Sequence, residues 1–175
     1  MRILICIVAL GAIQLSAARA QSDLESQVKA AFLFKFAYFV DWPAAAFNDS
    51  AAPLVIGILG ETPFGDALEK TVRGKKVKGR QVEIRPFSEY EEVGVCHILF
   101  IGSGMKDSLK ETLKQLDGTS ILTVGEHKRF ARAGGMIQFV MRDGMVRFAI
   151  QPEAARRAGL RLGAKLLKLA EIVKE

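Results

Sequence analysis

Three short apolar runs limit what this 175-residue chain can fold into. They cover residues 53–60, 95–101 and 120–124, and each has the length of a strand. A continuous apolar run is typical of a strand that is covered on both faces, as in the middle of a parallel sheet. Helices are expected after the first two runs, over 64–72 and 106–116. This alternation predicts a single α/β domain with a mixed, mostly parallel sheet and helices on both of its faces.

The C-terminal part predicts an antiparallel hairpin followed by a helix. Residues 136–141 and 146–150 are expected to be the strands, because Asp143-Gly144 is a favoured dipeptide for a tight hairpin turn. Pro152 begins a short helical turn, and Gly159 ends it. A last helix is then expected over 160–173, with its leucines buried and its lysines and arginines on the outer face.

An aromatic helix is expected over residues 22–40, ahead of the sheet. Apolar residues recur along it at helical spacing, and Phe34 and Phe36 add apolar surface on the other side. Such a helix must be buried on two faces, either within the fold or against a partner. Trp42 and Pro43 end it, because a residue before proline is pushed out of the α region. Trp42 then either fills the core or anchors a ligand or an interface.

The first 20 residues have the features of a secretion signal. Arg2 precedes the apolar run 3–13, and Ala18-Arg19-Ala20 is a small-x-small cleavage site. The apolar run is shorter than the roughly 20 residues that a membrane-spanning helix needs. We therefore expect an exported, periplasmic protein whose mature domain covers residues 21–175, with an uncleaved anchor as the alternative.

Charge and cysteine content limit the kinds of partner and the disulfides that this protein can have. The predicted leader carries two arginines and no acidic residue, so removing it lowers the net charge from +6 to +4. This modest excess, in an exported protein, predicts no nucleic-acid partner, whereas an acidic protein or a small anionic ligand remains open. Cys96 is the only cysteine outside the leader, which excludes an internal disulfide. Its thiol is either packed in the core or available for an intermolecular disulfide.

Catalytic signals are weak, and we expect neither an enzyme nor a bound cofactor. His97 and His127 are the only histidines, and neither has the spacing of a metal site. Ser103 lies between two glycines but lacks the spacing of a nucleophile elbow. A hydrolase that pairs Ser103 with His127 is kept as an alternative.

The first apolar run ends in glycines, which is where open α/β sheets place ligands. Backbone N–H groups at this strand end, near Gly60 and Thr62, could face an anion. The segment matches neither dinucleotide nor phosphate-loop patterns, and its glycines equally suit close strand–helix packing.

Four segments together resemble the YfiR-like family of periplasmic regulators. They are KAAFLFKFAYFVDWP (29–43), CHILFIG (96–102), GGMIQF (134–139) and VRFAIQPEAARRAGLRLGAKLLKLA (146–170), which occur in this order across the mature chain. The resemblance implies a periplasmic α/β protein, often dimeric, that binds and represses an inner-membrane diguanylate cyclase. Trp42 and Pro43 match the residues that close the family's first helix, and Arg161 matches the arginine that enters its last helix. The single cysteine departs from members that form internal disulfides.

The leading hypothesis is therefore a non-enzymatic periplasmic repressor of a membrane diguanylate cyclase or related sensor, which would lower cyclic-di-GMP output and biofilm formation. The alternative is a periplasmic protein that binds a small molecule such as a nucleotide or an amino acid. A homodimer is left open. The candidate partner- or ligand-binding residues are Phe32, Phe36, Phe39, Trp42, Pro43, Gly60, Thr62 and Arg161.

Overall fold

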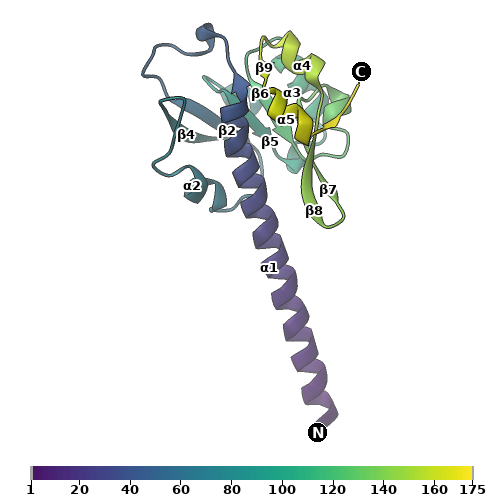
Figure 1. Cartoon of the computed structure of the whole chain (residues 1–175). Coiled ribbons are helices and arrows are strands. Elements are labelled where there is room, and N and C mark those ends of the chain that lie inside the picture. The colour runs from purple at the N-terminus through teal and green to yellow at the C-terminus, as the bar shows by residue number, and fades with distance from the viewer. Residues whose placement is uncertain (1, 175) are drawn as a thin grey trace.

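A computed structural model describes the backbone of residues 2–174 and the side chains of residues 19–174. The chain forms a single α/β domain with a long N-terminal helix, α1 (Arg2–Phe39), which runs along one face of a sheet (Figure 1). The sheet has eight strands in the order β10-β8-β7-β6-β5-β2-β4-β3. Its strands are β2 (Leu54–Leu59), β3 (Lys76–Val77), β4 (Arg80–Phe87), β5 (Ile98–Ile101), β6 (Leu122–Gly125), β7 (Ile137–Arg142), β8 (Met145–Ile150) and β10 (Glu171–Ile172).

The centre of the sheet is parallel, as the apolar runs predicted. Strands β4, β2, β5, β6 and β7 are parallel neighbours, whereas β7–β8 and β3–β4 are antiparallel. Every residue of β2 and β5 is buried, which explains why their sequences are continuously apolar. The mixed α/β class is thus confirmed.

Helices cover both faces of the sheet. On one face, α1, α2 (Ala67–Val72), α4 (Pro152–Arg157) and α5 (Ala164–Leu169) contribute to the larger hydrophobic cluster. On the other face, α3 (Leu109–Leu116) packs Leu109 and Leu113 against Leu99 and Ile101 of β5. Alternate side chains along each strand point to opposite faces of the sheet, so each face contributes to one of the two hydrophobic clusters.

The C-terminal hairpin is confirmed in detail. Strands β7 and β8 pair with Arg142 opposite Met145, so Asp143 and Gly144 form a two-residue turn. Both turn residues have positive φ, 50° for Asp143 and 71° for Gly144. Such a turn matches the twist of the strands, and Asp-Gly tolerates it best.

The predicted last helix over 160–173 is wrong. Arg161 and Leu162 form the short strand β9 (Arg161–Leu162), which pairs antiparallel with β1 (Val40–Asp41). Helix α5 then covers only Ala164–Leu169, and β10 follows it. The leucine spacing predicts one helix, but strand pairing with β1 and β8 divides the segment into three elements.

Two other expected helices are shorter than predicted. After Thr62 the chain makes turns, so α2 begins only at Ala67. The helix expected over 106–116 likewise begins only at Leu109, after a 3₁₀ turn at Ser103–Met105. Short segments of this kind lack the length that stabilises an α-helix by itself.

Helix α1 is continuous through the predicted start at Ser22, whose carbonyl accepts a hydrogen bond from Ser26 within the helix. The side chains of residues 1–18 of the predicted leader lie outside the described part of the chain, so cleavage after Ala20 stays a prediction. Among the described residues, no helix is long and apolar enough to cross a membrane.

Candidate functional site: an aromatic groove

An apolar groove of about 560 Å³ lies where α1, α5 and β8 meet. Its walls come from segments that are far apart in sequence and that the fold brings together. The lining residues are Ala31, Phe32, Phe34, Lys35, Phe36, Tyr38, Phe39, Thr71, Lys75, Phe148, Leu166 and Leu169.

Three phenylalanine rings build the groove from the inside. Phe32 and Phe36 are one helical turn apart on α1, and their ring centroids are 6.2 Å apart. Phe148 of β8 contacts both rings edge-on, at 5.3 Å from Phe32 and 5.2 Å from Phe36. Such edge-to-face contacts add to the energy of burial and fix the ring positions.

The three phenylalanines predicted as contact residues do not have the same role. Phe36 is only 1% exposed, so it supports the groove from the core and offers no surface to a partner. Phe32 and Phe39 are half-buried and line the groove. They are therefore the two of the three that a bound molecule can touch.

The rim of the groove exposes large apolar side chains. Leu169 of α5 is 68% exposed, and Tyr38 of α1 is 45% exposed. Single exposed leucines are common, but these side chains adjoin an aromatic hollow. A partner that covered Leu169 and Tyr38 would remove a continuous apolar surface from water.

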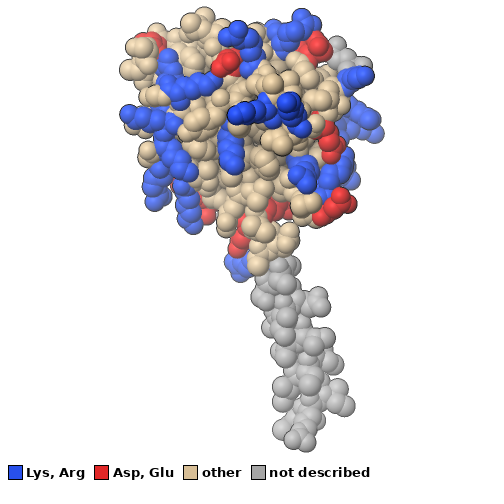
Figure 2. Space-filling view, in the orientation of Figure 1, with Lys and Arg blue, Asp and Glu red and all other residues tan. Residues whose placement is uncertain are grey.

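The charges beside the groove are positive. Lys35 and Lys75 line it, and none of its lining residues is acidic. The Lys75 Nζ lies 5.1 Å from the centre of the Phe34 ring, a cation–π contact that holds it at the edge. Figure 2, in the orientation of Figure 1, shows that lysine and arginine side chains also lie over α5 and over the side that carries β4 and α2. The groove therefore suits an apolar group accompanied by negative charge.

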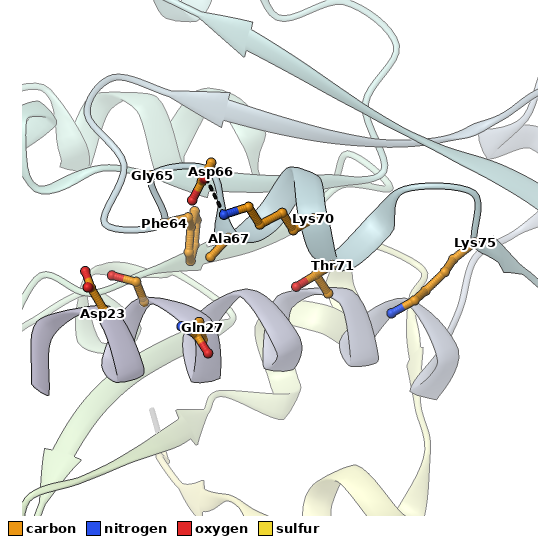
Figure 3. A pocket seen from close by; sticks show the side chains of 10 residues that line it. Asp23, Gln27, Phe64, Gly65, Asp66, Ala67, Lys70, Thr71 and Lys75 are labelled. Atoms are coloured by element: carbon orange, nitrogen blue, oxygen red, sulfur yellow. Dashed lines mark ion pairs between the residues drawn. The ribbon is translucent and has the colours of Figure 1, made fainter. Parts of the chain in front are cut away.

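A second, polar cavity of about 730 Å³ adjoins the groove between α1 and α2. Asp23 and Gln27 line it from α1, Asp66 and Lys70 line it from the opposite side, and Lys75 extends toward α1 (Figure 3). The ion pair between Lys70 and Asp66, at 2.5 Å, lies on its wall. Its walls carry both acidic and basic side chains, so they do not favour a ligand of one charge.

Trp42, Pro43 and Arg161 lie beyond the C-terminal end of α1 and do not line the groove. The indole N–H of Trp42 donates to the His97 carbonyl at 3.1 Å, and its half-buried ring packs against the core. Pro43 precedes a 3₁₀ turn (Ala44–Ala46). The structure thus favours the interpretation in which Trp42 fills the core.

Arg161 lies on the short strand β9, outside the lining of the groove. It is exposed and lies opposite Asp41 in the β1–β9 pair. A hydrogen bond from Lys78 lowers the pKa of the Asp41 carboxyl, and the charges of Lys78 and Arg161 add to this. Two residues on, the N–H of Gly163 donates to the Phe39 carbonyl at 2.7 Å. The β1–β9 pairing and this hydrogen bond hold the start of α5 beside the end of α1, and Arg161 lies at this junction.

Gly60 and Thr62 are not brought together with the groove. The Gly60 N–H donates to the Phe87 carbonyl at 3.1 Å, and the Thr62 hydroxyl accepts the Phe64 N–H at 3.2 Å. Gly102 packs so closely that a Cβ there would lie 1.9 Å from the Glu61 carbonyl oxygen. These contacts favour close packing at this strand end, because the Gly60 amide already has a partner.

The hydrolase alternative gains no support from geometry. Ser103 is exposed on a 3₁₀ turn (Ser103–Met105), and the Nδ1 of His127 accepts the Arg129 N–H. Within residues 19–174, no hydrogen bond joins Ser103 to His127. Among the same residues, no group of three or more His, Cys, Asp or Glu side chains is placed to hold a metal ion.

Nine residues that line the groove were not among the candidates from the sequence: Ala31, Phe34, Lys35, Tyr38, Thr71, Lys75, Phe148, Leu166 and Leu169. Phe148 and the leucines belong to the segment that carried the family resemblance, but only the fold places them against α1. No local pattern marks Lys75, which reaches the groove from the turn after α2.

Residues 26–171 match the protein family described as YfiR/HmsC-like. The chain belongs to this family. The matched range includes the aromatic part of α1, the sheet as far as Glu171, and α5, so it contains every residue that lines the groove. At the level of the YfiR/HmsC-like family, the function is that of a periplasmic regulator of diguanylate cyclases. A search of curated proteins found no match.

Proposed function

We propose that this protein is a non-enzymatic periplasmic repressor that binds the periplasmic part of an inner-membrane diguanylate cyclase or a related sensor. Binding would lower cyclic-di-GMP output and, with it, biofilm formation. Family membership supports the class of partner. The aromatic groove between α1, α5 and β8 supports the place of contact.

The observation that carries this proposal is the combination of the groove with exposed Leu169 and Tyr38 at its rim. Burying apolar surface contributes about 25 cal/mol per Å², so an apolar side chain seated between Phe32 and Leu169 can serve as an anchor. Lys35 and Lys75 then select partners that carry carboxylates near that anchor.

Repression follows if the partner has two conformations and this protein binds one of them more tightly. Binding shifts the population toward the bound conformation by the difference between the two affinities. No chemical step is needed on the regulator's side. The groove is largely preformed, because Phe36 and Phe148 hold its floor in the absence of a partner.

Co-purification with membrane diguanylate cyclases tests the proposal, using two matched variants. Leu169→Asp places a charge in the groove, whereas Val95→Asp changes an exposed apolar side chain (47%) outside its lining. We expect the wild type and Val95→Asp to retain a cyclase and Leu169→Asp to lose it at least tenfold. Equal retention by both variants would remove the groove as the contact surface.

A small molecule is the second candidate, since the groove volume of about 560 Å³ lies within the range of small-molecule sites. Its apolar lining and two lysines fit an amphiphilic anion better than a nucleotide. A ligand that binds the folded state raises the unfolding midpoint. Thermal scans with aromatic amino acids, nucleotides and medium-chain carboxylates distinguish these classes, and a midpoint that rises in the wild type but not in Leu169→Asp would place the ligand in the groove.

A further inference from the structure

Strand β4 has one side that the fold leaves largely unpaired. Toward the centre of the sheet it pairs with β2 along six residues, from Val82 to Phe87. On the outer side β3 covers only Arg80 and Gln81. The chain that leads into β3 comes from α2 and does not follow this edge. There the Lys75 N–H donates to the Val72 carbonyl of α2. In the described part of the chain, no strand lies outside β4 from Val82 to Pro86.

The direction of the backbone groups along this edge follows from the β3–β4 hairpin. Val77 lies opposite Arg80 across the two-residue turn Lys78-Gly79, whose φ values are 51° and 84°. In such a hairpin the residues that flank the turn bond to each other, so the N–H and C=O of Arg80 face outward from β2.

Backbone direction alternates along the strand, so Val82, Ile84 and Pro86 also face outward. The Phe87 carbonyl agrees with this alternation, because it accepts the Gly60 N–H on the β2 side. Two N–H donors and three carbonyl acceptors therefore line the open edge. Only Pro86 lacks a donor.

Open edges are usually protected by prolines and charges, and this edge has both. Its charges, however, have opposite signs and are two residues apart, so Glu83 and Arg85 lie on the same face of the strand. They form an ion pair within one copy at 2.7 Å, and both side chains are exposed. A sequence of this kind is complementary to itself when read in the opposite direction.

We propose that a second copy of this chain binds the edge, with the two β4 strands antiparallel about a two-fold axis at Ile84. In this register Glu83 faces Arg85 of the second copy, and Arg85 faces its Glu83. The two Ile84 residues exchange both backbone hydrogen bonds. Each Val82 N–H donates to the Pro86 carbonyl of the other copy. Because proline has no N–H, this pair makes one backbone hydrogen bond instead of two. Opposite charges placed directly across strands stabilise pairing.

The position of this interface leaves the groove free. Strands β2, β5, β6 and β7 separate β4 from β8 in the sheet. At about 4.8 Å per strand, the pairing edge lies well over 20 Å from the groove wall formed by β8. A dimer built in this way presents two open grooves, and its existence does not depend on the proposed partner.

Charge-swap variants test this pairing by sedimentation equilibrium on the mature protein. Glu83→Arg places like charges opposite Arg85, and Arg85→Glu places like charges opposite Glu83. Each variant alone is expected to weaken dimerisation at least tenfold. An equimolar mixture restores opposite charges at both contacts and is expected to regain the wild-type dimer as a heterodimer.

A dimer that is unaffected by either swap, a mixture that does not recover, or a wild type that stays monomeric at 100 µM (roughly the scale of a weak interface) would each overturn the proposal. Hydrogen exchange on the wild type provides a measurement without variants. The Ile84 and Val82 amides should exchange more slowly as protein concentration rises, whereas concentration-independent exchange at both amides contradicts the pairing.

Discussion

His97 and Val55 are joined by a hydrogen bond in which the Val55 N–H donates to the His97 Nδ1 at 3.0 Å. The Nε2 lies 3.0 Å from the Ala46 carbonyl oxygen, so this network assigns the proton to Nε2 and makes the ring neutral. Phe47 stacks on the ring at 4.2 Å, and Trp42 contacts its edge at 6.3 Å. One buried imidazole therefore ties the segment after α1 to β2 and to the start of β5.

This arrangement predicts that acid destabilises the fold through His97. Burial lowers the pKa of the His97 ring, and the nearby charges of Arg80 and Arg85 on β4 lower it further, against the opposing effect of the hydrogen bond to Ala46. The unfolded chain therefore binds a proton at a higher pH than the folded chain. Stability is fully present above about pH 6.5 and falls as the pH drops from there toward the lowered pKa.

Urea unfolding at pH 7.5 and at pH 5 measures this effect, with His97→Gln as the comparison. Glutamine cannot take up a proton, so we expect a smaller loss of stability in the variant than in the wild type between these two pH values. The fluorescence of Trp42, the only tryptophan, reports on the same contact. Identical pH slopes for the two proteins would contradict the assignment.

The two ion pairs of Lys29 are expected to contribute unequally to the free energy of unfolding. Its side chain is 8% exposed and pairs with Glu126 at 2.7 Å and with Glu25 at 2.6 Å. Burial alone would lower the pKa of Lys29, but the hydrogen bonds and charges of both carboxylates raise it. Glu126→Gln weakens the contact between α1 and the end of β6 and is expected to cost about 1–3 kcal/mol of unfolding free energy.

Glu25→Gln is the matched control for Lys29. Glu25 is one helical turn from Lys29 and more exposed, so its loss is expected to cost less than about 1 kcal/mol. Chemical denaturation of both variants gives the comparison. Equal costs would mean that the long-range pair with Glu126 does not anchor α1.

Cys96 is predicted to be unreactive in the native protein. Burial raises the pKa of its thiol to about 12, so almost no thiolate is present at neutral pH. A maleimide at pH 7.5 should therefore label the mature protein only after denaturation. Rapid labelling of the folded protein would reopen the intermolecular disulfide that its sequence left as an alternative.

The sheet was predictable because its central strands carry the signal themselves. A strand that is buried on both faces must be apolar throughout, and 53–60 and 95–101 satisfy this locally. The prediction for 160–173 was wrong because the structure of this segment depends on a contact that its own sequence does not show. Pairing of Arg161 and Leu162 with β1 is a long-range contact, and the leucine spacing is compatible with a single helix until that contact is known.

The groove was predictable only in part. The aromatic excess of α1 indicated a second buried face, and Phe32 and Phe39 do line a surface hollow. Phe36 faces the core instead, because Phe139 and Phe148 of the hairpin cover it. The hydrogen bonds of the His97 ring could not be predicted from the sequence, since its partners Val55 and Ala46 lie more than 40 residues away along the chain.

Intracellular cyclic-di-GMP in a deletion strain tests the central claim most directly. The strain is complemented with the wild type, Leu169→Asp or Val95→Asp, each exported to the same level. We predict that deletion raises cyclic-di-GMP, that the wild type and Val95→Asp restore the low level, and that Leu169→Asp does not. An unchanged level after deletion, or full restoration by Leu169→Asp, would contradict repression through the aromatic groove.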